Sequence, residues 1–219
     1  DANNQKTVDL LRQRKHRPTK PLAIMVPDLQ FLQDLSAQET ELLTSSAAPI
    51  VLLAKHKVPH IADNIAPNLQ EIGVMLPSNP LQHLLLRAVN RPLVMTSANA
   101  SGQPPVLKNE HAVEQLAGLA DFYLCHNRDI LQRADDSLVR VAFDGLETLR
   151  RARGYVPDEI PLETQSTKNV LALGSDLKNT FCLLRHNKAV LSQHIGDTAN
   201  EQVRSQLSEN LELFQNIYQ

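Results

Sequence analysis

The chain has 219 residues, of which 42% are hydrophobic and 21% charged, and its formal net charge is -2. These values exclude a disordered chain, and without a long basic run the protein is not suited to coating nucleic acid over its whole surface. No apolar run is long enough to cross a bilayer. The two cysteines, Cys125 and Cys182, have neither disulfide nor zinc spacing, so we expect a cytoplasmic protein.

The N-terminal segment predicts a helix over residues 4–14, then a basic turn and a strand. Five of the nine residues from Arg12 to Lys20 are lysine or arginine, and Pro18 and Pro21 end any helix. An apolar strand is predicted at 22–26. The basic segment is either a solvated turn or a clamp for polyphosphate. Its position before a strand of an α/β fold favours the clamp.

Two helices with clear start signals follow. Ser36 and Glu39 form a capping box that predicts a helix to about residue 45. Asn79 followed by Pro80 predicts a second helix to about residue 89. Strands are predicted at residues 49–54 and 72–76, with a loop between them. We expect the second helix to turn four apolar residues inward: Leu81, Leu84, Leu85 and Ala88.

An abrupt change of composition comes after the apolar run 92–95, which predicts a buried strand. The next residues are Thr96-Ser97-Ala98-Asn99-Ala100-Ser101-Gly102. Short hydroxyl and amide side chains beside an accessible backbone suit a phosphate or a nucleotide. The same residue types form ordinary turns at strand ends, and local chemistry alone favours the turn.

Beyond this loop, Asn109 predicts the N-cap of a helix through Leu116 that Gly118 closes. The apolar run 122–125 predicts a short strand, with Cys125 buried as a small hydrophobic residue.

Two adjacent acids, Asp135 and Asp136, precede a predicted hairpin. They either hold Mg²⁺ through one carboxylate and water or pair with neighbouring arginines, and we favour the pairing. The hairpin has strands at 137–143 and 146–152 around Asp144-Gly145, and it ends in a second basic cluster at 150–155.

The chain changes character after residue 156. Prolines and a polar run predict a linker. Three strands and a long helix that opens on the capping box Thr198 to Glu201 are predicted next, at residues 170–173, 179–184, 189–192 and 198–218. Three antiparallel strands with one helix form half of a small α/β lobe.

Taken together, these motifs resemble a known family. Three of them resemble the YrdC-type fold, which makes acyl-adenylates of carbamate derivatives from ATP: Lys15-x-Arg17-x-x-Lys20-Pro21, Thr96-Ser97-Ala98-Asn99-x-Ser101-Gly102 and Arg150-Arg151-x-Arg153-Gly154. Longer runs resemble the HypF carbamoyltransferases of hydrogenase maturation: 63–67, 73–82, 126–130 and 176–181. The resemblance covers essentially the whole chain.

The resemblance implies an α/β protein with a twisted mixed sheet and flanking helices. It places a YrdC-like domain at residues 1–158, a linker at 159–169 and the first part of an actin-like transferase domain at 170–219. The chain begins without a methionine and ends directly after a helical pattern, so we expect an internal part of a longer polypeptide. The family's opening strand, zinc sites and histidine metal site would then lie outside it, and we assign no metal to its residues.

The implied reaction joins carbamate, derived from carbamoyl phosphate, to AMP from ATP, with Mg²⁺ as the expected ion. The carbamoyl group then passes to the C-terminal cysteine of HypE. By this resemblance, Lys15, Arg17 and Lys20 act on phosphates and carbamate. The adenylate would be held by Thr96, Ser97, Asn99 and Ser101, with Arg151 and Arg153 closing the site.

A second phosphate loop is suggested by analogy with actin-like ATPases, which place one between their first two strands. The corresponding residues here are Asp176, Lys178 and Thr180. Two alternatives have other functions: a threonylcarbamoyl-AMP synthase of tRNA modification, which does not continue into an actin-like domain, and a module that binds double-stranded RNA through its basic clusters.

Overall fold

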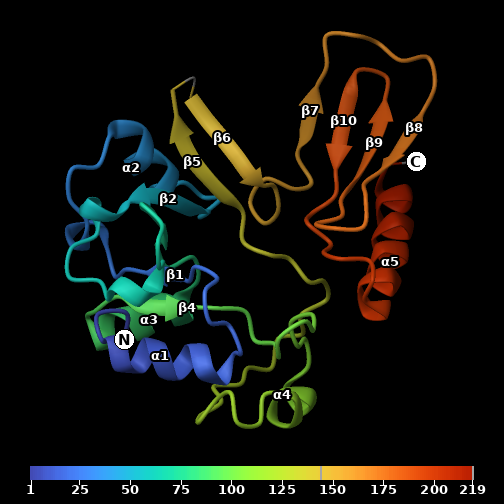
Figure 1. Ribbon diagram of the computed structural model, residues 1–219. Helices are drawn as coiled ribbons and strands as arrows, with labels where there is room; N and C mark the ends of the chain where they lie inside the picture. Colours follow the sequence, from blue (N-terminus) through green and yellow to red (C-terminus); the bar gives the residue numbers. More distant parts are fainter. Residues whose placement is uncertain (144, 219) are drawn as a thin grey trace. The chain divides into compact units, whose positions relative to one another are not determined.

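The computed structural model describes residues 1–143 and 145–218, and the chain divides into two compact units (Figure 1). The first unit is Asp1–Arg133 with Leu138–Leu149, and the second is Ala134–Ser137 with Arg150–Gln219. Asp144 of the predicted hairpin turn lies outside the described residues. Each unit is considered by itself.

The first unit is built on a six-stranded mixed sheet, as the sequence predicts. Its strands, in spatial order, are β4 (Leu93–Met95), β1 (Ala23–Met25), β3 (Glu71–Met75), β2 (Ile50–Ala54), β5 (Leu138–Ala142) and β6 (Gly145–Arg150). β1 runs parallel to β3 and β2 runs parallel to β5, whereas β1 with β4 and β2 with β3 are antiparallel.

Four helices belong to this unit, and α2 and α3 begin at the caps that the sequence predicts. They are α1 (Gln5–Arg14), α2 (Ala37–Thr44), α3 (Pro80–Val89) and α4 (Asn109–Gln115). The Asn4 side chain accepts from Thr7 N at 3.2 Å, and the Asn79 side chain accepts from Gln82 N at 3.0 Å. Ser36 and Glu39 form both bonds of the predicted capping box. Among the described residues, each helix is too short or too polar to cross a membrane.

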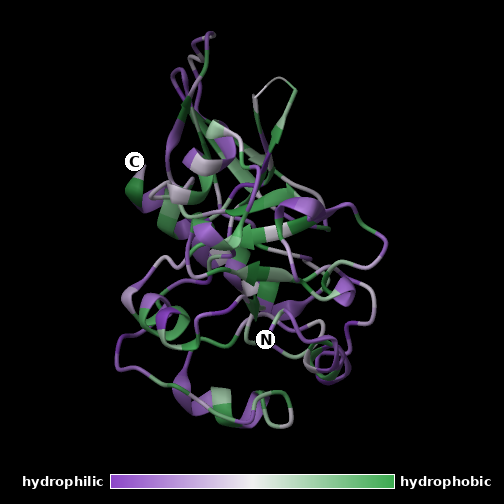
Figure 2. Cartoon of the chain, turned by 90° about the vertical axis from the view of Figure 1, so that its left-hand side faces the viewer, coloured by the Kyte–Doolittle hydropathy of each residue, from purple (hydrophilic) through white to green (hydrophobic). Residues whose placement is uncertain are grey.

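The core of the first unit lies along the central strands. Ile24, Val51 and Val74 are fully buried, and Figure 2 shows hydrophobic colouring along strands and hydrophilic colouring along many loops. Close packing also requires a glycine at position 73, because a Cβ there would lie 2.8 Å from Cγ2 of Ile50. The Ile50 side chain on β2 therefore fills the space that a side chain at position 73 would need.

Four sequence predictions for this unit are wrong. The apolar face of α3 is exposed, and of its leucines only Leu86 is buried. Residues 122–125 form no strand, Phe122 is 92% exposed and Cys125 is exposed, because this apolar run has no ladder partner. Asn109 does not cap α4: its amide donates to His126 O at 2.7 Å, and Lys108 occupies the cap position. The predicted strand before the loop at 96–102 is only half-buried.

The second unit is a four-stranded antiparallel sheet with one helix. In spatial order its strands are β7 (Glu159–Pro161), β10 (Lys188–Leu191), β9 (Phe181–Arg185) and β8 (Val170–Leu173). α5 (Glu201–Ile217) lies along this sheet (Figure 1). Their shared core is formed by Phe181, Val190, Ile195, Val203 and Phe214.

Two details of the second unit differ from expectation. The segment expected as a linker contains β7, which pairs with β10. α5 is capped by Asn200, whose side chain accepts from Gln202 N at 2.9 Å. Thr198 is not the cap, because its hydroxyl donates to Asp176 Oδ1 at 2.8 Å.

The capping box of α2 gives the first testable prediction. Glu39 accepts two bonds from Lys57 Nζ, at 2.8 and 2.7 Å, and one from Ser36 N at 2.7 Å. Burial alone would raise the pKa of Glu39, but the bonds from Lys57 and Ser36 outweigh it and hold the pKa below its usual 4.5. A lowered pKa means that the carboxylate stabilises the fold above about pH 4.5, and that this contribution is lost as the pH falls through the lower folded-state pKa.

We therefore expect Glu39→Gln to lower the free energy of unfolding by about 1–3 kcal/mol near neutral pH. The difference from wild type should shrink in acid, where the native residue also loses its charge. Denaturant unfolding followed by circular dichroism measures this. Glu41→Gln, on the exposed face of the same helix, is the control, and an equal loss in both variants would contradict the assignment.

Candidate functional site

The loop after β4 is organised around the side chain of Asn99. Ser97 Oγ donates to Asn99 Oδ1 at 2.6 Å, and Asn99 Nδ2 donates to Gln103 O at 2.6 Å. The loop is closed by a bond from Val106 N to Ala98 O at 2.9 Å, and Gly102 has a φ of 78°, which favours glycine. The four predicted nucleotide ligands between Thr96 and Ser101 thus lie in one hydrogen-bonded loop, whereas Arg151 and Arg153 lie outside it.

Lys15 reaches this loop from the end of α1. Its side chain is largely buried, with the residue 8% exposed, and Nζ donates to Ser97 O at 2.9 Å, Asn99 O at 2.6 Å and Asn99 Oδ1 at 3.0 Å. A lysine ammonium has three N–H donors, so the loop accepts from all of them. Burial, and to a lesser degree the charge of Arg17, lower the pKa of Lys15. The structure therefore brings together the basic segment and the Ser-Ala-Asn loop, 82 and 84 residues apart along the chain.

The other two predicted phosphate ligands lie on the turn that follows Lys15. His16 has a φ of 47°, which turns the chain sharply after α1. The Arg17 guanidinium donates to Pro21 O at 2.6 Å. Lys20 is exposed, and its ammonium makes no hydrogen bond within the described part of the chain.

The arrangement is suited to an anion. The charge of Lys15 is met by neutral oxygens instead of a carboxylate, so the positive potential at the loop is not cancelled. Thr96 Oγ1 is buried and has no hydrogen-bond partner among the described residues, which leaves a polar atom for a ligand. Ser101, five residues further along the same loop, is exposed. Together these groups could bind phosphate oxygens and the polar edge of a nucleotide.

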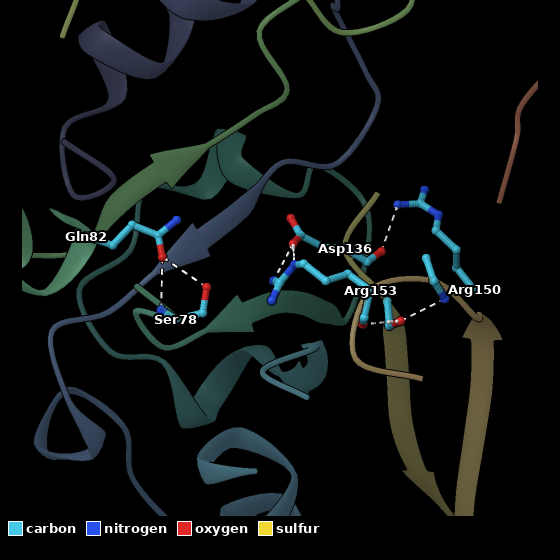
Figure 3. A network of polar contacts seen from close by, with 7 residues as sticks. Ser78, Gln82, Asp136, Arg150 and Arg153 are labelled. Carbon is cyan, nitrogen blue, oxygen red and sulfur yellow. Dashed lines mark hydrogen bonds and ion pairs between the residues drawn. The ribbon is translucent and has the colours of Figure 1, made fainter. Parts of the chain in front are cut away.

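The second basic cluster belongs to the second unit. Arg153 donates to Asp136 Oδ1 from Nε at 3.2 Å and from Nη2 at 2.6 Å, and Arg150 Nη1 donates to Asp136 O at 3.4 Å (Figure 3). Arg151 donates to Asp158 O at 3.3 Å and lies 5.9 Å from the centre of the Tyr155 ring. The charge of Arg153 is thus balanced by a carboxylate, unlike that of Lys15, and its role in closing the site stays a prediction.

Asp135 has a partner that the sequence did not suggest. His194 Nδ1 lies 2.6 Å from Asp135 Oδ2, 59 residues away along the chain. Pairing with an arginine is thus correct for Asp136, whereas Asp135 hydrogen-bonds to His194 and also interacts with the charge of Arg150. A lone histidine in a predicted strand-to-helix connection carries no signal of such a partner, so His194 was missed. No group of three His, Cys, Asp or Glu side chains within the described ranges has a metal-binding arrangement.

The turn between β8 and β9 is tightly packed. A Cβ on Gly174 would lie 2.5 Å from Thr180 O, so only glycine fits there. Asp176 Oδ1 accepts from Thr198, and Lys178 N donates to Asp197 Oδ1 at 2.9 Å. These bonds hold the turn against the segment before α5. Its role as a phosphate loop remains a prediction.

Comparison with known proteins defines the class of each part. Residues 1–152 match the Sua5/YciO/YrdC family, described as "Telomere recombination", and the chain belongs to this family. Residues 165–219 match the HypF Kae1-like domain. The two domains together are those of the HypF carbamoyltransferases, which confirms the resemblance recognised in the sequence.

Individual relatives agree with this assignment. Carbamoyltransferase HypF of Synechocystis sp. is 44% identical over 90% of this chain and 26% of its own length. A crystal structure of full-length HypF in the phosphate- and nucleotide-bound form superposes with a TM-score of 0.90 at 40% identity, over 98% of this chain and 34% of that one. A threonylcarbamoyl-AMP synthase of Xylella fastidiosa is 32% identical over 55% of this chain and 71% of its own length. The chain therefore spans about a quarter to a third of the HypF proteins it matches.

The Asp135–His194 pair gives the second prediction. Burial alone would raise the pKa of Asp135, but the bond from His194 and the charges of Arg150 and His194 outweigh it and lower the pKa below its usual 3.8. The carboxylate therefore stabilises the second unit above about pH 4, and the stabilisation is lost as the pH falls through the lower folded-state pKa.

We expect Asp135→Asn and His194→Ala each to lower the free energy of unfolding of the second unit by about 1–3 kcal/mol at neutral pH. The double variant should lose little more than either single variant, because both remove one interaction. Unfolding curves of the four proteins measure this coupling, with Glu209→Gln on the exposed face of α5 as the control. Fully additive losses would show that the two residues act independently.

Proposed function

We propose that this chain is the carbamoyl-adenylate-forming part of a HypF-type carbamoyltransferase of hydrogenase maturation. The observation that carries the proposal is the loop at residues 96–103 held by the buried ammonium of Lys15. This cationic loop lies in the unit that matches the YrdC-type family. The nucleotide-bound form of a related HypF supports it.

The reaction needs charge stabilisation more than a protein nucleophile. A carbamate oxygen bonds to the α-phosphorus of ATP while the bond from that phosphorus to the bridging oxygen breaks, which releases pyrophosphate and leaves carbamoyl-AMP. Negative charge grows on the phosphate oxygens, and fixed cations stabilise it better than mobile water does. Arg17 and Lys20 are the proposed phosphate ligands, and Lys15 would act through its charge and by holding the loop.

The loop side chains would bind the adenylate. Thr96 Oγ1 is a buried oxygen without a partner in the described residues, and Ser97, Asn99 and Ser101 would supply further hydroxyl and amide groups. Arg151 and Arg153 are proposed to close the site. Mg²⁺ would arrive on the ATP phosphates, because the described residues hold no cluster of acidic ligands for it.

The proposed partners follow from the HypF relatives. Carbamate would come from carbamoyl phosphate, and the carbamoyl group would pass to the C-terminal cysteine of HypE with the help of other domains of the same polypeptide. Both cysteines of this chain are free, which agrees with a reducing, cytoplasmic location.

Substrate dependence separates this proposal from its nearest alternative. In ATP–pyrophosphate exchange we expect this chain to respond to ammonium carbamate, with no requirement for threonine. The reason is that the HypF Kae1-like segment accompanies the YrdC-type unit here. Exchange that requires threonine and bicarbonate would instead identify a threonylcarbamoyl-AMP synthase. Tight binding of double-stranded RNA with no binding of ATP in calorimetry would reject the enzyme assignment.

Asn99 gives a direct test of the loop. Asn99→Ala removes the acceptor for Lys15 and Ser97 and the donor to Gln103. We expect ATP affinity to fall about tenfold or more, which corresponds to about 1.4 kcal/mol. Isothermal titration calorimetry measures the change, with Asn127→Ala at an exposed position as the matched control. Unchanged ATP affinity in a folded Asn99→Ala protein would exclude this loop from the site.

A further inference from the structure

One arginine of the basic segment does not face solvent at all. Arg12, in the last turn of α1, is 6% exposed, and its guanidinium donates six hydrogen bonds to five backbone carbonyls. The acceptors are Arg17 O at 2.8 Å, Pro18 O at 3.3 Å, Lys20 O at 2.9 Å, Asn64 O at 2.8 and 2.6 Å and Ile65 O at 3.1 Å.

These acceptors belong to two segments. One is the turn 17–20, which carries Arg17 and Lys20. The other is the turn at Asn64 and Ile65, 52 and 53 residues further along. Ile65 O also accepts from Leu22 N at 2.9 Å, at the start of the strand that follows the basic turn. The path of the basic turn is therefore fixed against a second loop through one guanidinium.

The second loop is itself tied to α1. Asn64 Nδ2 donates to Asp9 Oδ1 at 2.6 Å and to Gln5 O at 3.0 Å. Because Arg12 and Asp9 both lie on α1, the helix, the basic turn and the loop at Asn64 form one hydrogen-bonded assembly. The geometry requires a planar fork with five N–H donors, which lysine, with three donors, cannot reproduce.

Arg12 also differs from its neighbour in electrostatics. No carboxylate hydrogen-bonds to it among the described residues, and its positive charge is met by carbonyl oxygens. Arg14, two residues away, forms a two-bond ion pair with Asp121 at 2.7 and 2.9 Å near the surface. Arginines are rarely buried without a carboxylate that hydrogen-bonds to them. Here the Arg12 guanidinium instead fixes the backbone of the turn 17–20 through its carbonyl oxygens.

We propose that Arg12 is a positioning residue for the pyrophosphate half of the ATP site. It holds the carbonyls of residues 17, 18 and 20 toward itself, so that the side chains of Arg17 and Lys20 keep the placement that the β- and γ-phosphates require. This inference rests on the proposed function. It assigns the polyphosphate to the turn that Arg12 orders, and the adenosine monophosphate half to the loop that Lys15 holds.

The positioning role of Arg12 can be tested because it concerns only the polyphosphate half of ATP, so a variant should affect pyrophosphate and AMP differently. Arg12→Lys keeps the charge but loses most of the carbonyl bonds, and Arg12→Gln loses both. Calorimetry with ATP, pyrophosphate and AMP should show ATP and pyrophosphate affinity reduced about tenfold or more in Arg12→Lys, and further in Arg12→Gln. AMP affinity should stay within about threefold of wild type. Arg14→Gln, which removes the neighbouring surface ion pair, should leave all three affinities unchanged.

Amide hydrogen exchange measured without nucleotide tests whether Arg12 orders the turn. The exchange of β2 and β3 in the same sample shows whether the whole unit has lost stability. In Arg12→Lys without nucleotide, amides of the basic turn that have measurable protection should exchange faster than in wild type, while those of β2 and β3 keep their protection. An equal loss of ATP and AMP affinity, or unchanged exchange in the basic turn, would overturn the positioning role. If wild type binds neither nucleotide, the proposed function fails, and the exchange result still decides whether Arg12 orders the turn.

Discussion

The first unit depends on two buried cations that hydrogen-bond to neutral oxygens and to no carboxylate among the described residues. Lys15 and Arg12 both project from the end of α1, and the neutral oxygens of three other segments satisfy them. Burying a charge is costly unless every donor is bonded, so these contacts must be kept for the unit to fold. The same contacts leave net positive charge at the loop after β4. One arrangement thus supplies both structural order and attraction for phosphate.

The second unit uses the opposite arrangement. Its two acids each have a side-chain partner, Asp136 in Arg153 and Asp135 in His194. These pairs attach the short segment 134–137 to the connection between β6 and β7 and to the connection between β10 and α5. A balanced network of this kind contributes structure and little electrostatic attraction. This contrast supports the proposal that the first unit binds phosphate.

Local signals predicted most of the fold. The caps at Ser36 and Asn79 were correct because a capping bond involves residues three apart. The errors come from side chains with competing long-range partners. Asn109 donates to His126, and Thr198 donates to Asp176, so neither caps the helix that its sequence suggests. Burial was harder to predict than helix starts. The periodicity of the sequence identifies an apolar face on α3, but it does not show whether another element covers that face.

The site was predictable only in part. Resemblance to a family identified Lys15 and the loop at 96–102, and the structure joins them. Arg12 looked like one more cation in a basic run, because its acceptors at Asn64 and Ile65 are remote in sequence and are backbone atoms. His194 was missed because its partner, the carboxylate of Asp135, is also remote in sequence. Residue type reveals neither contact, since both depend on how distant segments meet.

We propose that the basic turn and the Lys15-held loop bind one nucleotide. Binding can be measured by titrating ATP into the isotopically labelled chain and following the nuclear magnetic resonance shifts of its amides. We expect shifts concentrated in residues 12–20 and 96–103, with those of the basic turn reduced when AMP replaces ATP. Shifts confined to the turn at 174–180, or no shifts at ATP concentrations that support pyrophosphate exchange, would contradict it.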